Sequence, residues 1–192
     1  MSRENLFITV DGIDRCGKST LVSKLKDLFW GSETFSLPKR RQVGVKGVSK
    51  ARYPSGRLID LYLKKHLFLS PNEVSILMLS NLVESQEELS EMLQTKTVIC
   101  DRYVLSNKAY DMARGLTPRE RNLLKPDFQF LILASPDECS KRKGYGEEAL
   151  ESLKFQRKVD AAFRKLSKED NVHILEGNED EILSQARKIL NK

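Results

Sequence analysis

A short segment near the N-terminus has the residue types and spacing of a phosphate-binding loop. The run Gly12-Ile-Asp-Arg-Cys-Gly17-Lys18-Ser19 matches the pattern G-x-x-x-x-G-K-[ST] at every fixed position. In such a loop, backbone N–H groups surround a phosphate, the lysine contacts the β- and γ-phosphates, and the serine hydroxyl ligates Mg²⁺. An apolar run precedes the segment and helical spacing follows it, as this chemistry requires. The sequence therefore predicts binding of a nucleoside triphosphate.

A second pair of charged residues, Asp101 and Arg102, follows the apolar run 97–100. Open parallel sheets bind their ligands at the carboxyl ends of the strands, which is where both the pair and the phosphate loop are expected. A guanidinium can donate to two phosphate oxygens at once. Taken alone, the pair is equally compatible with a structural ion pair or a strand-end cap. Beside a phosphate loop, we favour the functional interpretation.

The elements that must position these residues alternate along the chain. Short apolar runs predict strands at 6–10, 33–37, 97–100, 128–134 and 173–175. Helical spacing predicts helices at 19–29, 58–67, 71–93 and 181–190, a short helix opening at Pro118, and a charged, mostly helical stretch at 137–166. Residues 38–57 are expected to form a basic loop. Strands that alternate with helices indicate an α/β fold, a parallel sheet flanked by helices.

Composition excludes several classes of protein. The 192 residues are 40% hydrophobic and 31% charged, which fits one globular domain over 1–192. No run approaches the roughly 18 apolar residues of a membrane span, and no cleavable signal is expected. Three scattered cysteines favour a reducing compartment, the cytoplasm or, in a eukaryote, the nucleus. The net charge of +6 fits a small polyanionic ligand as well as nucleic acid, and we expect the small ligand.

Beyond the phosphate loop, the sequence resembles the thymidylate kinase family. Asp11-Gly-Ile-Asp-Arg-Cys-Gly-Lys-Ser-Thr20 is close to the family's E-G-x-D-R-x-G-K-[ST]-T, and Asp101-Arg-Tyr-Val-Leu-Ser-Asn-Lys-Ala-Tyr110 is close to D-R-Y-x-x-S-G-x-A-[YF]. Lys125-Pro-Asp127 leads into a strand, as in the family. These segments span nearly the whole chain in family order. The resemblance implies a three-layer P-loop kinase fold with a short helical lid at about 140–154.

The resemblance also implies an activity, the transfer of the ATP γ-phosphoryl group to dTMP with Mg²⁺ as cofactor, in a homodimer. Carried over by position, Arg15, Lys18 and Arg102 are catalytic, Arg102 holds the acceptor phosphate, and Asp14 bonds the sugar hydroxyl. Ser19 and Asp101 are the expected metal residues. The expected ATP contacts are Gly12, Asp14, Arg15, Cys16, Gly17, Lys18, Ser19 and Thr20. The expected acceptor contacts are Asp14, Arg40, Met78, Arg102, Ser106, Asn107 and Tyr110.

Several positions depart from the family pattern. The helix motif [FL]-x-x-N-R-[WF]-E is Met78-Leu-Ser-Asn-Leu-Val-Glu84, so Leu82 stands in place of an arginine. Asn107 replaces a glycine. The lid motif E-R-Y-E aligns with Glu148-Ala-Leu-Glu151, which places the catalytic arginine in the phosphate loop, as Arg15, rather than in the lid. The nearby cations 141–143 are expected to form a solvated helix face.

Alternatives remain open at two levels. The family's F-P-x-R arginine is either Arg40, which we prefer, or Arg57. Because Met78, Leu82 and Leu150 alter the acceptor pocket, the chain could phosphorylate another nucleoside monophosphate. A third reading is a catalytically weak nucleotide-binding regulatory protein, which the intact Lys18 and Arg102 disfavour.

Overall fold

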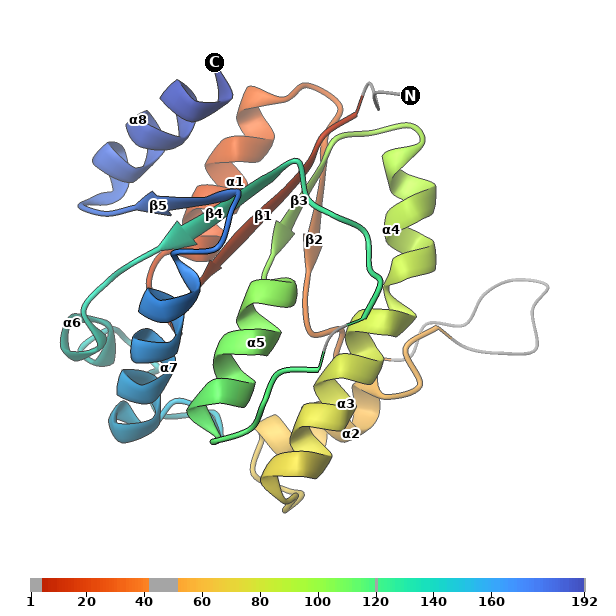
Figure 1. The fold of residues 1–192 in the computed structure, drawn as a ribbon, viewed down its shortest axis with the longest axis vertical. Helices are drawn as coiled ribbons and strands as arrows, with labels where there is room; N and C mark the ends of the chain where they lie inside the picture. The colour runs from red at the N-terminus through yellow and green to blue at the C-terminus, as the bar shows by residue number, and fades with distance from the viewer. Residues whose placement is uncertain (1–4, 42–51, 120, 192) are drawn as a thin grey trace.

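The computed structural model describes residues 5–41, 52–119 and 121–191. Its centre is a five-stranded, all-parallel sheet with the order β2-β3-β1-β4-β5 (Figure 1). The strands are β1 (Phe7–Gly12), β2 (Glu33–Ser36), β3 (Val98–Asp101), β4 (Phe128–Ile132) and β5 (Val172–Leu175). The predicted α/β fold with a parallel sheet is confirmed, with each predicted strand within a few residues of its place.

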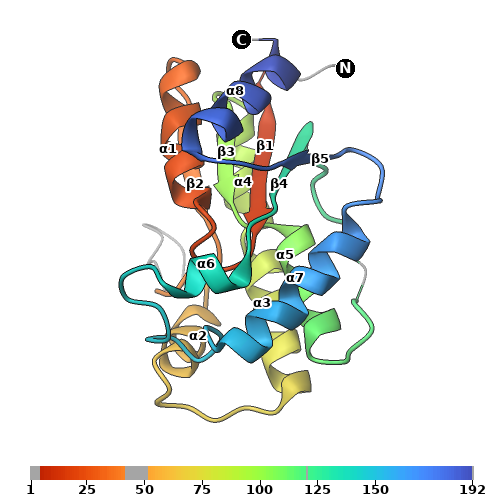
Figure 2. The ribbon, with the colours of Figure 1, turned by 90° about the vertical axis from the view of Figure 1, so that its left-hand side faces the viewer.

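Helices cover both faces of this sheet. They are α1 (Lys18–Leu28), α2 (Gly56–Leu63), α3 (Pro71–Glu84), α4 (Gln86–Leu93), α5 (Val104–Ala113), α6 (Pro136–Ser140), α7 (Leu153–Leu166) and α8 (Glu179–Leu190). Helices α1 and α8 lie on one side of the sheet and α5 and α7 on the other (Figure 2). Helices α2 and α3 lie beyond the carboxyl ends of the strands (Figure 1). No helix in the described ranges has the length and apolar character to cross a membrane.

The buried apolar side chains of the described residues form two clusters. Successive strand residues point to opposite faces, so Phe7 packs in a cluster with Leu89 and Leu93 of α4, while Ile8 packs in the cluster that contains Leu21 of α1. The central strands β1 and β3 are largely buried, and each contains a continuous apolar run, as is typical of parallel strands. This packing fixes the ends of β1 and β3, from which the polar residues of the site project.

The long helix predicted over 71–93 is two helices. Ser85 ends α3 and begins α4. The Ser85 hydroxyl and the Gln86 side-chain amide both donate to the Leu82 carbonyl, at 2.6 and 2.9 Å. Side-chain donors of this kind bend helices by competing with the backbone. The helix predicted over 58–67 is also shorter, because Lys65 adopts a left-handed conformation with φ of 62°.

Two further expectations about helices are wrong. The described residues 117–119 and 121–127 contain no helix opening at Pro118; the helix of that region is α5, which ends before it. The expected lid is not helical either, since residues 141–152 form turns between α6 and α7. Gly144 and Gly146 have φ of 77° and 87°, values that interrupt a right-handed helix. Of the predicted basic loop, residues 42–51 lie outside the described residues.

Candidate active site

The phosphate loop, residues 12–19, connects β1 to α1. Gly17 occupies the N-cap of α1 with φ of 106°, a conformation that favours glycine. At Gly12, an added Cβ would lie 2.6 Å from Cys16 Sγ and 2.7 Å from the Ile132 carbonyl oxygen. The close approach of β4 and the thiol therefore requires glycine at this position. The loop presents the N-terminus of α1, with its unpaired N–H groups and positive end, to the space above the sheet.

Lys18 and Ser19 occupy the first turn of α1. The Lys18 side chain is buried, and its Nζ donates to the Ile13 carbonyl at 2.6 Å across the loop. The Ser19 hydroxyl donates to Asp101 Oδ2 at 2.7 Å, so the residues predicted from two distant motifs lie side by side. One ammonium, one hydroxyl and one carboxylate are thus concentrated at the carboxyl ends of β1 and β3.

Asp14 is the centre of a hydrogen-bond network. Its carboxylate accepts from Arg102 Nη2, from the Tyr110 hydroxyl at 2.8 Å and from Gln156 Nε2 at 2.6 Å. Its backbone N–H donates to Gln156 Oε1 at 3.0 Å. Burial alone would raise the pKa of Asp14, but the Arg102 guanidinium and the Lys18 ammonium outweigh burial and hold the pKa below its ordinary value. The carboxylate is therefore ionised and fixed in position.

Arg102 is positioned by its backbone as well as by its partners. It has φ of 69°, and Arg15 has φ of 62°, so both arginines adopt the left-handed conformation that is uncommon outside glycine. Arg102 Nη1 donates to the Gly12 carbonyl at 3.0 Å, and the guanidinium lies 5.3 Å from the centre of the Tyr110 ring. Such backbone conformations concentrate at functional sites.

Asp11, at the end of β1, holds the start of α5 in place. Its Oδ1 accepts from the backbone N–H groups of Tyr103 and Ser106, both at 3.0 Å, and from the Ser106 hydroxyl at 2.5 Å. Burial raises the pKa of Asp11 above its ordinary value despite these hydrogen bonds. One carboxylate of β1 thereby satisfies the free N–H groups that begin α5.

The lid, residues 141–152, contacts the phosphate loop directly. Arg15 Nε lies 3.1 Å from Glu151 Oε1, and its Nη1 and Nη2 donate to the carbonyls of Lys143 and Gly144 at 2.5 and 2.6 Å. Arg142 donates to the Arg15 carbonyl at 2.5 Å. Arg142 is exposed, as expected, but the expectation of a helix face is wrong, because Arg142 lies in a turn and contacts the loop.

These groups surround one cavity of about 570 Å³. Its wall contains thirteen of the predicted site residues: Asp14, Arg15, Gly17, Lys18, Ser19, Thr20, Arg40, Met78, Asp101, Arg102, Ser106, Asn107 and Tyr110. The other two predicted loop residues, Gly12 and Cys16, are buried and are not among the described residues that line the cavity. The structure therefore brings residues from the loop, β3, α3 and α5 to a single space.

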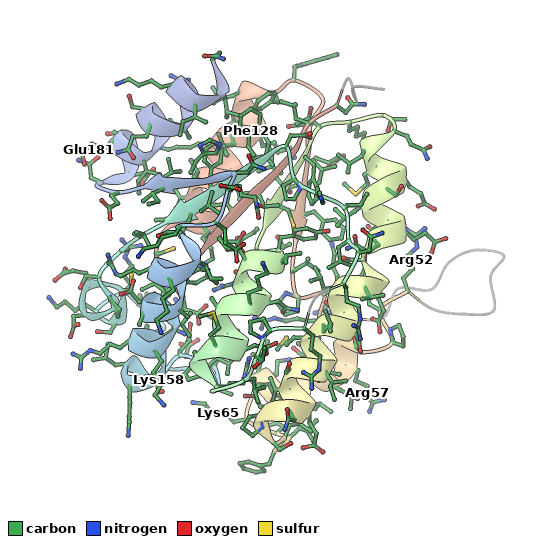
Figure 3. The ribbon with its side chains drawn as sticks, viewed as in Figure 1. Arg52, Arg57, Lys65, Phe128, Lys158 and Glu181 are labelled. Carbon is green, nitrogen blue, oxygen red and sulfur yellow. The ribbon has the colours of Figure 1, made fainter. Side chains whose placement is uncertain are left out.

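Of the two alternative arginines, Arg40 lies in the cavity wall. Its Nη1 lies 2.7 Å from Glu148 Oε1 of the lid. Arg57 is exposed in the first turn of α2 (Figure 3) and is not among the described residues that line the cavity. Asn81 holds the segment that carries Arg40, since its side chain accepts from Lys39 N at 2.7 Å and donates to the Lys39 carbonyl at 3.0 Å. The geometry thus favours Arg40.

Helix α3 and the lid contribute both apolar and polar side chains to the cavity wall. Met78, Leu82 and Leu150 are among the apolar ones, and Leu82 is also part of the core cluster with Phe35 and Tyr53. Sequence reasoning did not identify Arg114, which follows α5 and lines this cavity. It also missed that Gln156 holds Asp14. The only sequence signal for Arg114 is its spacing of seven residues from Asn107, which puts both on one helix face.

The donor set at Ser19 and Asp101 fits a magnesium ion. Both side chains supply oxygen, which Mg²⁺ prefers, and Mg²⁺ is commonly held by one or two protein oxygens together with substrate phosphates and water. Their 2.7 Å hydrogen bond establishes that the two oxygens reach the same point. The described residues contain no group of three His, Cys, Asp or Glu side chains arranged for a metal ion, so a site built from protein side chains alone is not present there.

Comparisons with known proteins agree with the fold and the site. The chain matches the family model described as thymidylate kinase over residues 10–188. It is 30% identical to the thymidylate kinase of Dictyostelium discoideum over 202 aligned residues, which cover 98% of this chain and 86% of that one. The thymidylate kinase of Schizosaccharomyces pombe is 32% identical over 181 residues, covering 88% and 81%. The solved structure of the thymidylate kinase from Candida albicans superposes with a TM-score of 0.81 and 26% identity, covering 100% and 93%.

Proposed function

The chain belongs to the thymidylate kinase family, and on that basis we propose that it transfers the γ-phosphoryl group of ATP to dTMP, giving dTDP and ADP. The observation that carries the proposal is that Lys18 of the phosphate loop and Arg102 of the second motif line the same cavity. A donor phosphate held by the loop and an acceptor phosphate held by Arg102 would then lie next to each other. Phosphoryl transfer needs that juxtaposition and little covalent chemistry from the protein.

Each charged group has a proposed role in that transfer. Arg102 binds the acceptor phosphate, and its hydrogen bond to Asp14 keeps the guanidinium fork in the correct orientation. Asp14 is also available to accept from a hydroxyl of the acceptor sugar. Arg40, from the segment held by Asn81, adds a second cation for the acceptor phosphate. Lys18 must exchange the Ile13 carbonyl for a phosphate oxygen when ATP binds.

Ser19 and Asp101 are the proposed magnesium residues. Bound there with ATP, Mg²⁺ would neutralise charge on the β- and γ-phosphates. Ser19 would supply a direct oxygen ligand, and Asp101 would orient the ion or its water molecules. The hydrogen bond between the two side chains holds both oxygens at the same place before ATP binds.

Arg15 is proposed to stabilise the negative charge of the transferring phosphoryl group. Its guanidinium bonds the lid carbonyls of Lys143 and Gly144, so the cation is drawn to the boundary between loop and lid. A donor fixed at the place where charge develops lowers the barrier without reorganisation during the reaction. The lid carbonyls would therefore hold Arg15 in place for this role.

The test is an ADP-release assay with Mg-ATP and a panel of acceptors: dTMP, dUMP, UMP, dCMP, CMP, AMP and GMP. Preferred turnover of dTMP is the expected result. Preference for another monophosphate would keep the mechanism and change the acceptor, an outcome that Met78 and Leu82 in the cavity wall make worth testing. If no acceptor in the panel stimulates ADP release while ATP still binds, the kinase proposal is overturned in favour of a regulatory nucleotide-binding role.

We also propose a homodimer formed through α2 and α3. Three apolar side chains on these helices are exposed: Leu58 by 47%, Ile76 by 53% and Val83 by 45%. Exposed apolar groups on adjoining helices are typical of interfaces. Light scattering coupled to size exclusion should give twice the chain mass of 22.0 kDa. An Ile76→Asp variant should shift that mass to the monomer, and a wild-type mass of one chain would contradict the proposal.

A further inference from the structure

Arg114 is a buried cation whose hydrogen-bond donors are only partly paired with protein groups. Its side chain is only 6% exposed. Its Nη1 lies 3.5 Å from Asp111 Oδ1, and Tyr62 provides a further contact. Its Nη2 is buried without a hydrogen-bond partner among the described residues. Buried polar groups are nearly always satisfied, and an unsatisfied charged donor is costly, so this nitrogen requires an explanation.

The surroundings of Arg114 hold its guanidinium rigidly. It lies 5.9 Å from the centre of the Tyr110 ring and 5.8 Å from that of Phe155, both distances at which an aromatic face attracts a cation. Asp111, its acidic neighbour, is shared, because Asp111 Oδ2 also accepts from the Ser75 hydroxyl at 2.8 Å. Burial lowers the pKa of Arg114, with Tyr62 and Asp111 opposing that shift. The group is therefore preorganised, with one nitrogen left to bond.

Arg114 and Arg102 both line the acceptor cavity, with their guanidinium groups 5.9 and 5.3 Å from the centre of the Tyr110 ring. Helix α5 has ten residues, or about 15 Å at 1.5 Å per residue, and Arg102 and Arg114 flank it at opposite ends. Helical side chains tilt toward the N-terminus, which directs Arg114 back along the cavity toward Tyr110. Arg102 is bonded to Asp14 and Gly12 beside the phosphate loop, whereas Arg114 is paired with Asp111. We therefore assign Arg102 to the acceptor phosphate and Arg114 to the base.

The apolar side chains of the cavity wall make the donor groups of Arg114 important for recognition of a base. Met78, Leu82 and Leu150 can pack on a base but cannot donate a hydrogen bond to it. Asn107, two helical turns before Arg114, lines the same face of α5. Since Leu82 offers no donor, Arg114 is the cationic donor available to the base from this face.

We propose that Arg114 determines acceptor specificity by donating from its guanidinium to a carbonyl oxygen of the acceptor's pyrimidine base. This inference rests on the proposed function, because it takes the cavity to hold a nucleoside monophosphate. A site built around a hydrogen bond to one substrate atom discriminates against ligands that lack the atom, since the buried group is then left unpaired.

The test compares an acceptor that has a base with a ligand that lacks one. Steady-state assays would give the KM for dTMP, the KM for ATP, and the inhibition constant of 2-deoxyribose 5-phosphate as a competitor of dTMP. In Arg114→Met we expect the KM for dTMP to rise about tenfold or more, as for loss of a hydrogen bond to a charged group. The KM for ATP and the inhibition constant should stay unchanged. Arg187→Met, an exposed arginine of α8, is the matched control.

Every other pattern overturns the inference. An unchanged KM for dTMP means that the Arg114 guanidinium does not contact the acceptor. A parallel rise in the inhibition constant means that Arg114 only maintains the shape of the cavity. If Arg114→Met does not fold, Arg114→Lys replaces it, because lysine keeps the charge and stem but loses the planar fork. The KM for dTMP should again rise while the inhibition constant of 2-deoxyribose 5-phosphate stays unchanged. Failure of the proposed function is recognised separately, because wild-type protein would then not phosphorylate dTMP.

Discussion

Arg15 of the phosphate loop and Glu151 of the lid form an ion pair across 136 residues of sequence, with Nε and Oε1 3.1 Å apart. The other two nitrogens of the same guanidinium donate to main-chain carbonyls of the lid. The Arg15 side chain therefore connects the phosphate loop to the lid. The position of the Arg15 guanidinium is thus tied to the position of the lid.

Arg15→Ala should reduce turnover and leave ATP affinity largely intact. Loss of a fixed donor to developing charge costs on the order of a hundredfold in kcat. Measurement of kcat beside the dissociation constant for ATP separates the two effects. Glu151→Gln is the control, since it leaves Arg15 and its two carbonyl acceptors in place and should retain most of the turnover. An unchanged kcat in Arg15→Ala would refute the role.

Arg102→Ala should act on the acceptor rather than on ATP. The guanidinium lies between Asp14 and the cavity, where a bidentate contact with a phosphate is available. We expect the KM for dTMP to rise on the order of a hundredfold, as for a lost charge-assisted hydrogen bond. Titration of ATP in the same variant checks that the donor site is intact. A change confined to ATP affinity would contradict the assignment.

Asp14 should make stability depend on acidic pH. Its pKa is lower in the folded protein than the unfolded value of about 3.9. Its stabilising contribution is therefore fully present above that unfolded value and is lost as pH falls through the lower, folded value. Urea unfolding of wild type and Asp14→Asn would show it, with the gap between the two free energies of unfolding narrowing below about pH 4. A gap that widens there would mean that the pKa is raised.

Gly12→Ala should destabilise the fold more than an alanine in an open turn. The new Cβ would meet the Ile132 carbonyl at 2.7 Å, and Gly12 also has φ of 149°. We expect a loss of about 2 kcal/mol or more in the free energy of unfolding from overpacking and strain. Gly31→Ala is the control, because it has φ of 76° but no atom within 4 Å of the new Cβ. Equal losses in the two variants would show that backbone conformation alone matters.

The sequence identified features whose signals are local. The phosphate loop, the end of β3 and the strands were all predicted, because each is written in consecutive residues. Helix α5 was missed because its start depends on Asp11, 92 residues before Tyr103, rather than on a capping residue beside it. The division of the helix at Ser85 likewise depends on competition for one carbonyl, which periodicity does not reveal.

Within the cavity, the motif residues were predicted and the residues that hold them were not. Gln156 holds Asp14 from α7, and Arg142 contacts the loop from the lid. Neither relation has a sequence pattern, since both join segments that meet only in the folded chain. Arg114 was overlooked for a different reason. A single arginine after a helix is ordinary, and only burial of its Nη2 distinguishes it.

The contact of Arg15 with the carbonyls of Lys143 and Gly144 determines which lid sequences the fold can accept. Every residue has a main-chain carbonyl, so the side chain at position 143 can be exchanged without removing its acceptor. Position 144 has no such freedom, because φ there is 77° and a Cβ would lie 3.1 Å from both guanidinium nitrogens. A substitution at position 143 should therefore preserve the contact with Arg15, whereas a substitution of Gly144 should disturb it.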